Sequence, residues 1–450
     1  MTSRSFSGRV GGFLARPGTM VVTAFLIRYG LFYGFRVGGP FPVTDVFPIG
    51  YETGRIARSL ALGLGYSSPL RFDTGPTAWL TPVYPFLLAG VFKIFGVYSW
   101  ESFLVITAVD CAFSALTAWV IWAIGRKAFS PACGVTAGWI WTLLPSAIFY
   151  PVAWVWDTSL SALAMALIVL ATMRLVETER TAAWGGYGAL WGAGAMVNAS
   201  LCSTLPVLLG WAAWKVRRGA RKWLKPALVA ALVFVVVISP WFARNYVVFH
   251  RLILFRSNFG LELWLGNNPL NPGVWSWWVH PNDNDEEGRL YARMGEIAYM
   301  DLKQKEAIGW IRANPGTFVH QCFRRFVDNW TGLDEPVTDI LARPWYVSAA
   351  MSQEVLFPMM GLVGLLVAYR KRSPYAFPFA ASIFVFPLVY YVTHTSLRYR
   401  HPIDPLLCVM AGYSGVGAYA WLRTRVSRSG RGTETVEHER EMAAAGERLP

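Results

Sequence analysis

The stretch KVRRGARKWLKPALVAALVFVVVISPW, from Lys215 to Trp241, decides the class of fold. Its second half belongs to a run without a charged residue at 226–243. A helix of roughly 20 apolar residues is needed to cross the hydrocarbon core of a bilayer. The first half carries six basic residues, as expected for a loop on the cytoplasmic side. The stretch therefore predicts a membrane-spanning helix that begins in the cytoplasm.

The composition of the whole chain supports the same class. Of the 450 residues, 54% are hydrophobic and only 15% are charged, which is typical of a membrane protein. The formal net charge of +14 would suit a nucleic-acid-binding protein if it lay on one face. The basic residues instead fall in short clusters between apolar runs, so we expect no nucleic-acid partner. The five cysteines form no CxxC pair and indicate neither a zinc site nor a disulfide framework.

Apolar runs of near-spanning length recur along the chain. They predict an all-α polytopic membrane protein with about ten transmembrane helices. The fifth and sixth runs are short and share the turn near Asn198, so they are either a tilted hairpin or one miscounted pair. The basic clusters predict a multi-pass protein of the cell membrane with both termini in the cytoplasm. The runs are residues 18–38, 101–124, 133–152, 158–174, 184–199, 201–214, 226–243, 353–369, 374–392 and 403–422.

The same pattern divides the chain into four parts. An N-terminal transmembrane core is predicted at 1–243, with a long first outer loop at 39–100. An extracytoplasmic loop region follows at 244–345, where acidic and basic residues are nearly balanced. C-terminal transmembrane helices occupy 346–424. The polar composition of 425–450 predicts a disordered cytoplasmic tail.

Two segments of the outer regions are predicted to be helical. The run from Val83 to Phe95 is apolar but short and contains Lys93, which favours a helix lying in the membrane interface. The segment from Glu286 to Asn314 has helical periodicity and ends at Asn314-Pro315-Gly316. We therefore expect one interfacial helix in the first outer loop and one long helix in the second region.

The first outer loop carries the most specific motif, TDVFPIGYETGRIARSLALGLGYSSPL, from Thr44 to Leu70. An acidic residue, Glu52, precedes a Gly-x-Gly-aromatic turn and then a proline-containing apolar segment. In this order the loop resembles the membrane glycosyltransferases of the C-type fold, in particular the family 39 group that contains the protein O-mannosyltransferases and the lipid A aminoarabinose transferase. The resemblance spans most of residues 18–422 and includes the stretches WVWDTSLSAL, PWFARNYVVF, LWLGNNP and RYRHPIDP.

The resemblance implies transfer of a monosaccharide from a polyprenyl-phosphate donor to an extracytoplasmic acceptor, with inversion by single displacement. The donor and membrane lipid are the expected partners, and the acceptor is a glycan, a lipid or a protein. Such transfer needs a carboxylate to take the proton of the attacking hydroxyl and cations to stabilise the leaving phosphate. No cofactor is expected with certainty, and a divalent metal ion near the outer carboxylates stays open. This chain has Leu80, Thr81 and Asn198 where the aminoarabinose transferase has lysines, so that sugar is not carried over.

Three carboxylates are candidates for the catalytic site. Glu52 is the first choice for the base because it opens the predicted loop helix. Asp45 is its rival, since the acid of the resembled enzymes lies farther before the glycine turn. The alternative for Glu52 is a structural ion pair with Arg55 or Arg58, and Arg55 is also a candidate ligand of the donor phosphate. Asp157 follows the outer end of a predicted span and is either an acceptor-orienting acid or a helix N-cap.

A second cluster lies between the last two predicted spans, again on the outer side. His394, Arg398, Arg400 and His401 are four potential cations placed against the positive-inside trend. Binding of the donor phosphate explains them, and we assign that role to Arg398, Arg400 and His394. Anchoring to lipid headgroups is the alternative.

Two other functional classes stay open. A lipid or glycan transporter or flippase would place polar groups near mid-membrane and often consists of repeated halves, but the sequence has no internal repeat. A noncatalytic envelope assembly protein would keep the fold without the carboxylates, which Glu52 and Asp157 disfavour.

Two charges fall inside predicted spans at similar depth. Arg28 lies near the middle of the first span, and Asp110 lies within the second. Because isolated charges are costly in a membrane, each is expected to face the bundle interior and find a partner. The simplest prediction is that they pair with each other. Alternatively, Arg28 extends to the interface and Asp110 is protonated and hydrogen-bonded to a carbonyl.

Overall fold

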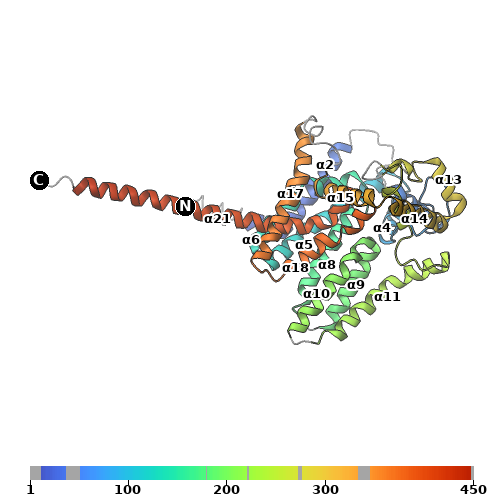
Figure 1. Ribbon diagram of the computed structural model, residues 1–450, viewed down its shortest axis with the longest axis horizontal. Coiled ribbons are helices and arrows are strands. Elements are labelled where there is room, and N and C mark those ends of the chain that lie inside the picture. The colour runs from blue at the N-terminus through green and yellow to red at the C-terminus, as the bar shows by residue number, and fades with distance from the viewer. Residues whose placement is uncertain are drawn as a thin grey trace.

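The fold is entirely helical where the structure describes it. The computed structural model describes residues 12–36, 51–178, 180–219, 222–271, 276–332 and 345–446. The single β pairing in these ranges is an isolated bridge between Ser67 and Pro76. In Figure 1 the helices α13 (Asp285–Met294) and α14 (Glu296–Ala313) lie at one end, and α21 (Asp404–Gly446) projects from the other. We refer to the end with α13 and α14 as the outer end.

Among the described residues, five helices are long and apolar enough to cross a membrane, and a sixth span is formed if one bent pair is counted together. The bent pair is α6 and α7, whose axes differ by 46° across a short break. The chain is therefore a polytopic membrane protein, whereas the number of ten spans stays a prediction. The helices are α5 (Trp100–Ala128), α6 (Pro131–Leu143), α7 (Pro145–Ala153), α8 (Thr158–Leu175), α11 (Leu224–Phe249), α17 (Trp345–Arg370), and the continuous stretch of α20 (Leu397–Arg400), η3 (His401–Ile403) and the start of α21.

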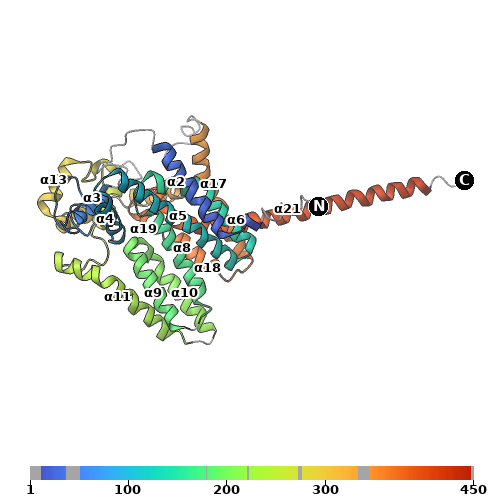
Figure 2. The same cartoon turned by 180° about the vertical axis from the view of Figure 1, so that it is seen from behind.

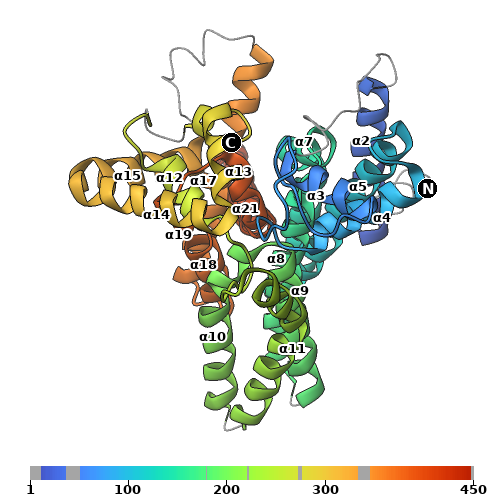
Figure 3. The same cartoon turned by 90° about the vertical axis from the view of Figure 1, so that its right-hand side faces the viewer.

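The remaining predicted runs form helices that do not reach spanning length and hydropathy by themselves. The two short runs around Asn198 are separate helices, α9 and α10, joined by η1. Figure 3 shows α9, α10 and α11 projecting together from the rest of the bundle. At Gly188 of α9 an added Cβ would lie 2.1 Å from the Ala230 carbonyl oxygen of α11, so these backbones touch and a small residue is required. The helices are α2 (Pro17–Arg36), α9 (Thr181–Val197), η1 (Ala199–Thr204), α10 (Leu205–Arg218), α18 (Ala376–Val385) and α19 (Leu388–Val392).

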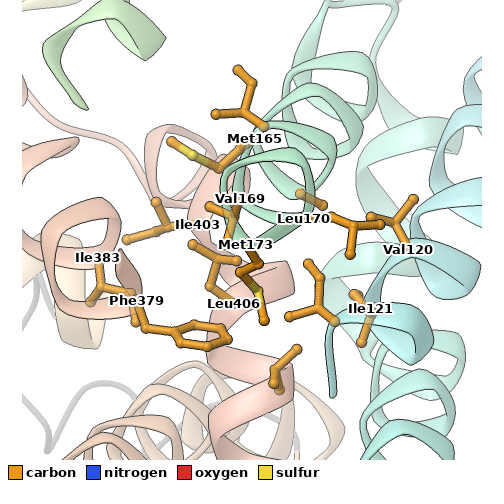
Figure 4. Packing of buried hydrophobic residues seen from close by; sticks show 14 of the residues in the cluster. Val120, Ile121, Met165, Val169, Leu170, Met173, Phe379, Ile383, Ile403 and Leu406 are labelled. Carbon is orange, nitrogen blue, oxygen red and sulfur yellow. The ribbon is translucent and has the colours of Figure 1, made fainter. Parts of the chain in front are cut away.

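A hydrophobic core joins the N-terminal and C-terminal halves of the bundle. Figure 4 shows apolar side chains of α5 and α8 packed against those of α18, η3 and α21. Segments far apart in the sequence are thereby held together by close packing, which fixes α8 against η3 just below the outer end. The labelled side chains are Val120, Ile121, Met165, Val169, Leu170, Met173, Phe379, Ile383, Ile403 and Leu406.

The first outer loop contains the helix expected at Glu52 and the expected short apolar helix. The helix α3 (Tyr51–Ala61) ends in the glycine turn, where Gly63 and Gly65 have φ angles of 79° and 78° that favour glycine. The helix α4 (Val83–Phe95) has 13 residues, so at about 1.5 Å per residue it is shorter than the hydrocarbon core. Figure 2 shows α3 and α4 close together at the outer end.

One prediction about the remaining segments is wrong, and another stays untested. The expected single helix at 286–314 is two helices, because Gly295 takes a φ of 76° between α13 and α14. The chain does end α14 at Ala313, and Pro315 then begins α15 (Pro315–Thr331). Residues 425–446 continue α21 as a helix, and the prediction that the tail at 425–450 is disordered stays a prediction. The last turns of α21 are rich in Glu, Arg and Ala, which are strong helix formers.

Arg28 and Asp110 do not form the predicted ion pair. The Arg28 guanidinium is fully buried and donates to the carbonyls of Trp141, Thr142 and Ala147, at 2.9 to 3.1 Å. These carbonyls flank the break between α6 and α7, where the helical hydrogen-bond ladder is interrupted. Asp110 instead accepts a hydrogen bond of 2.6 Å from the Tyr84 hydroxyl. Backbone carbonyls at the broken span therefore satisfy Arg28, which was predicted to pair with the Asp110 carboxylate.

Candidate active site

One cavity at the outer end brings the sequence-predicted residues together. It has a volume of about 1010 Å³ and lies between the first outer loop, the start of α8, α12 (Phe259–Gly266) and the segment before η3. In Figure 3, α3 and α12 come from opposite halves of the molecule. Glu52, Asp157 and Arg398 all line this cavity. Residues separated by more than 300 positions in the sequence therefore face one space.

Glu52 lies in the first turn of α3, where the helix dipole favours a carboxylate. Its Oε1 accepts a hydrogen bond of 2.7 Å from Asn282 Nδ2 and lies 3.6 Å from His280 Nε2. The Glu52 side chain is 18% exposed, so it keeps access to the cavity while its position is held. Asp45, its rival as the base, lies outside the described residues.

Arg55 stands behind Glu52 rather than among the cavity-lining residues. Its guanidinium is nearly fully buried and donates to Asn282 Oδ1 at 2.7 Å and to the Pro69 carbonyl at 3.4 Å. The Asn282 amide therefore connects Arg55 to Glu52, with its oxygen toward the cation and its nitrogen toward the carboxylate. Arg55 is thus linked to Glu52 through Asn282, and its predicted contact with the donor phosphate stays a prediction.

Asp157 lies directly before α8 but does not cap it, since its side chain makes no capping hydrogen bond. Its Oδ2 accepts from Ser161 Oγ at 2.9 Å, and Ser161 Oγ accepts from Asn198 Nδ2 at 3.2 Å. All three side chains line the cavity. Burial raises the pKa of Asp157, and the Ser161 hydrogen bond with the charges of Arg256 and Arg398 partly offsets this effect. The N-cap interpretation of Asp157 is therefore wrong.

The predicted cation cluster divides into two groups. Arg398 lines the cavity, with its guanidinium carbon 3.7 Å from the centre of the Trp156 ring and a nitrogen 3.1 Å from the Tyr399 hydroxyl. A stacked guanidinium keeps its in-plane N–H groups available for an anion. His394 also lines the cavity, and its Nε2 lies 2.5 Å from Glu262 Oε2.

Arg400 and His401 face the protein interior instead. Arg400 is 1% exposed and forms ion pairs with Glu354 and with Asp404, the latter at 3.1 Å. His401 is fully buried, with Nδ1 at 3.0 Å from Asp404 Oδ2. Neither residue lines the cavity. The prediction that Arg400 binds the donor phosphate is therefore not supported, because its charge is already neutralised by two carboxylates.

Four further residues of the cavity wall were missed by the sequence analysis. Arg256 donates to the Trp79 carbonyl at 3.0 Å, and its second terminal nitrogen lies 3.6 Å from Glu262 Oε1. Glu262 directly precedes the stretch LWLGNNP, which was its only signal in the sequence. His280 and Asn282 lie between η2 (Trp277–Val279) and α13 and have no local signature at all.

Glu296 ties the first outer loop to the 244–345 region. It is 5% exposed and accepts from the Ala78 amide at 2.7 Å, from Ser257 Oγ at 2.6 Å and from the Tyr291 hydroxyl at 2.8 Å. The Thr77 hydroxyl donates to it as well. Several donors around one buried carboxylate compensate for its desolvation. This junction holds the neighbouring residues Trp79 and Arg256 in the cavity wall.

The charged Glu262 carboxylate is predicted to stabilise the fold until acid protonates it. Burial alone would raise the pKa of Glu262, but the hydrogen bond and charge of His394, with Arg256 and His280, lower it from 4.5 to about 2. A depressed carboxylate pKa stabilises the folded state above the unfolded value and loses that contribution as the pH falls through the folded value. We expect Glu262→Gln to lower the thermal unfolding midpoint at neutral pH, and the difference from the unsubstituted protein to shrink between about pH 4.5 and about pH 2. A difference that does not change with pH would contradict this assignment.

A metal site is not evident among the side chains that the structure describes. These residues contain no group of three or more His, Cys, Asp or Glu side chains placed to hold a metal ion. The expectation of a divalent cation near the outer carboxylates therefore stays untested.

The comparisons with known proteins point to one fold. Residues 78–243 match the family described as dolichyl-phosphate-mannose-protein mannosyltransferase. The oligosaccharyltransferase AglB from Archaeoglobus fulgidus, solved with an inhibitory peptide and a dolichol-phosphate, matches 92% of this chain at 15% identity with a TM-score of 0.52. The apo form of the Archaeoglobus fulgidus enzyme gives a TM-score of 0.53 at 14% identity, again over 92% of this chain. No match was found among curated proteins.

A third solved structure is ArnT from Cupriavidus metallidurans bound to undecaprenyl phosphate, with 13% identity over 92% of this chain and 79% of that chain, and a TM-score of 0.38. The chain spans about half the length of the archaeal enzymes, 52% in both comparisons. At these identities the archaeal structures establish the fold, which is the C-type fold of membrane glycosyltransferases. The family resemblance drawn from the first outer loop agrees with the family match at 78–243.

Proposed function

We propose that this protein is a membrane glycosyltransferase that moves a monosaccharide from a polyprenyl-phosphate donor to an extracytoplasmic acceptor. The observation that carries the proposal is the single outer cavity in which a carboxylate, Glu52, and a stacked cation, Arg398, face the same space. The family match over 78–243 and the dolichol-phosphate bound to the similar archaeal oligosaccharyltransferase support it.

Glu52 acts as the general base in this proposal. Its carboxylate takes the proton of the acceptor hydroxyl while the hydroxyl oxygen forms a bond to the anomeric carbon. The bond from that carbon to the phosphate oxygen breaks, and the electron pair leaves with the polyprenyl phosphate. Asn282 and His280 keep Glu52 in place, and Arg55 orients Asn282 from behind. A base held by hydrogen bonds approaches the acceptor in a defined geometry.

Arg398 and Arg256 stabilise the leaving phosphate. Arg398 stacks on Trp156, and Arg256 reaches the cavity from the segment that precedes α12. Arg256 is balanced by Glu262, which lies 3.6 Å away and also contacts His394. Arg398 and Arg256 thus place two cations at the cavity wall, and the charge of Arg256 is only partly neutralised by Glu262. This arrangement suits a phosphate that gains negative charge as the glycosidic bond breaks.

Asp157 and Asn198 are placed to recognise hydroxyl groups. Both line the cavity and are joined through Ser161, so their remaining hydrogen-bonding capacity faces the cavity space. We assign them to the sugar or the acceptor. The transferred sugar is a hexose or a pentose, and the outer end faces the extracytoplasmic side of the cell membrane, with both termini in the cytoplasm. The basic clusters at the opposite end of the bundle support this orientation.

The proposal is tested by incubating the purified full-length protein with a panel of polyprenyl-phosphate sugars and measuring release of polyprenyl phosphate. Release that depends on an added acceptor supports transfer. Accumulation of an intact lipid-linked sugar on the opposite side of a proteoliposome, without release, would identify a flippase and overturn the proposal.

Arg398→Gln is expected to raise the Michaelis constant for the donor. Loss of one charge-assisted contact to phosphate costs roughly 1.5 to 3 kcal/mol, which corresponds to about tenfold to 150-fold. The acceptor Michaelis constant should change much less. The matched control is Arg312→Gln, an exposed residue at the end of α14 outside the cavity. Unchanged donor kinetics in the Arg398 variant would reduce Arg398 to an anchor for lipid headgroups.

A further inference from the structure

A second cavity shares no lining residue with the cavity that contains Glu52. It has a volume of about 600 Å³ and lies between α10 and the turn that joins α17 to α18. This is the end of the bundle where basic residues gather, opposite the outer end. The lining includes Trp211, Trp214, Lys215, Tyr369, Arg372 and Phe377. We call this space the α10–α18 groove.

The walls of the groove are largely apolar and aromatic. Trp211 is buried at its base, whereas Trp214, Tyr369 and Phe377 are each more than one third exposed at its sides. Gly210 forms part of the wall, and an added Cβ there would meet no atom within 4 Å. Tryptophan and tyrosine at the end of membrane helices are characteristic of the level of the lipid headgroups. The groove is thus shaped to accept an apolar chain beside an aromatic rim.

Two cations at the groove have no acidic partner among the described residues. The Lys215 ammonium lies 5.5 Å from the centre of the Trp214 ring and 5.9 Å from that of Trp211. Arg372 is exposed on the turn after α17. No described carboxylate lies within the 4.0 Å ion-pair distance of either side chain. Arg218, whose guanidinium carbon is 4.3 Å from the Trp214 ring centre, adds positive charge nearby.

We propose that the α10–α18 groove binds one anionic glycerophospholipid from the leaflet that surrounds the basic end of the bundle. An acyl chain lies against Gly210, Trp211 and Phe377, and the phosphate contacts Lys215 and Arg372. The positive charge of Lys215 and Arg372 favours this occupant. An apolar groove with uncompensated cations at the headgroup level complements a lipid whose head is negative and whose tail is apolar. The inference does not depend on the chemistry at Glu52.

Native mass spectrometry of the full-length protein tests the proposal. The protein is purified in a mild detergent, supplied with equal amounts of phosphatidylglycerol and phosphatidylcholine, and the retained lipid is counted. We expect retention of one phosphatidylglycerol in preference to phosphatidylcholine. Each cation near a lipid surface contributes about 1 kcal/mol, so Lys215→Gln with Arg372→Gln should weaken phosphatidylglycerol retention by about tenfold to thirtyfold.

Two matched controls separate the groove from general charge and from helix perturbation. Arg217→Gln with Lys371→Gln removes the same charge from the same end at residues that do not line the groove. Gly210→Phe fills the groove without altering charge and should abolish retention, whereas Gly186→Phe places the same side chain in open space on α9. Both control variants should keep the lipid.

Three results would overturn the proposal. They are equal retention of the two lipids, retention that survives Gly210→Phe, and a copurifying protein or second copy of the chain that Gly210→Phe releases. If Gly210→Phe does not fold, the paired substitution of Lys215 and Arg372 decides, because neither side chain is buried in the helix packing. Unchanged phosphatidylglycerol retention in that variant then rejects the site.

Discussion

Replacing Glu52 with Gln is expected to reduce the rate of sugar transfer by roughly a hundredfold to ten-thousandfold, the usual contribution of a general base. The amide has nearly the shape of the carboxylate, and its oxygen can still accept the hydrogen bond from Asn282. It cannot accept the proton of the acceptor hydroxyl. The loss should therefore appear in the maximal rate, with membrane insertion and thermal stability little changed.

The control for this experiment is Glu101→Gln. Glu101 is an exposed carboxylate in the first turn of α5, and it does not line the outer cavity. Transfer by this variant should equal that of the unsubstituted protein. Full activity of the Glu52 variant together with loss in Asp45→Asn would move the base to Asp45. Full activity of both the Glu52→Gln and the Asp45→Asn variants would show that neither residue of this loop is the general base.

The sequence predicted the framework of the site because membrane constraints act locally. Apolar runs and basic clusters mark helices and their direction wherever they occur. The place of Glu52 in the first turn of α3 and the glycine turn after that helix follow from neighbouring residues. The break between α6 and α7 was not predicted. The carbonyls that it places around Arg28 come together only when α2, α6 and α7 pack against one another.

Only part of the outer cavity could be predicted, because several of its residues are brought together by tertiary contacts. Asn282 and His280 come to Glu52 from more than 220 residues away, and neither lies in a motif. Their placement follows from the Glu296 junction, which joins the two outer regions through tertiary hydrogen bonds. A single sequence contains no periodic signal for such contacts.

Arg398 and Arg400 show that sequence alone does not separate the environments of two nearby charged residues. The two residues lie two positions apart in the one-turn helix α20, so their side chains point in different directions. One meets the Trp156 ring in the cavity, and the other meets Glu354 and Asp404 in the interior. Charge and sequence position alone assign both to the phosphate, whereas helix geometry separates their roles.

Arg400→Met is accordingly expected to destabilise the fold rather than to weaken donor binding. Removing the guanidinium leaves Asp404, which is 1% exposed, and Glu354, which is 14% exposed, without their cation. Breaking a buried ion pair from one side costs roughly 3 to 5 kcal/mol because the remaining charge stays desolvated. The measurement is the thermal unfolding midpoint in detergent, with Arg398→Met as the control that should unfold close to the unsubstituted protein.

A compensated variant makes this assignment specific. In Arg400→Met combined with Glu354→Gln and Asp404→Asn, the uncompensated carboxylates are gone, so a large part of the lost stability should return. Both folded variants should use the donor with a nearly normal Michaelis constant, since the cavity-facing Arg398 is intact. If Arg400→Met instead keeps its unfolding midpoint and raises the donor Michaelis constant as Arg398→Gln does, Arg400 must reach the phosphate in the working enzyme, and the separation of the two arginines into a binding and a structural residue is wrong.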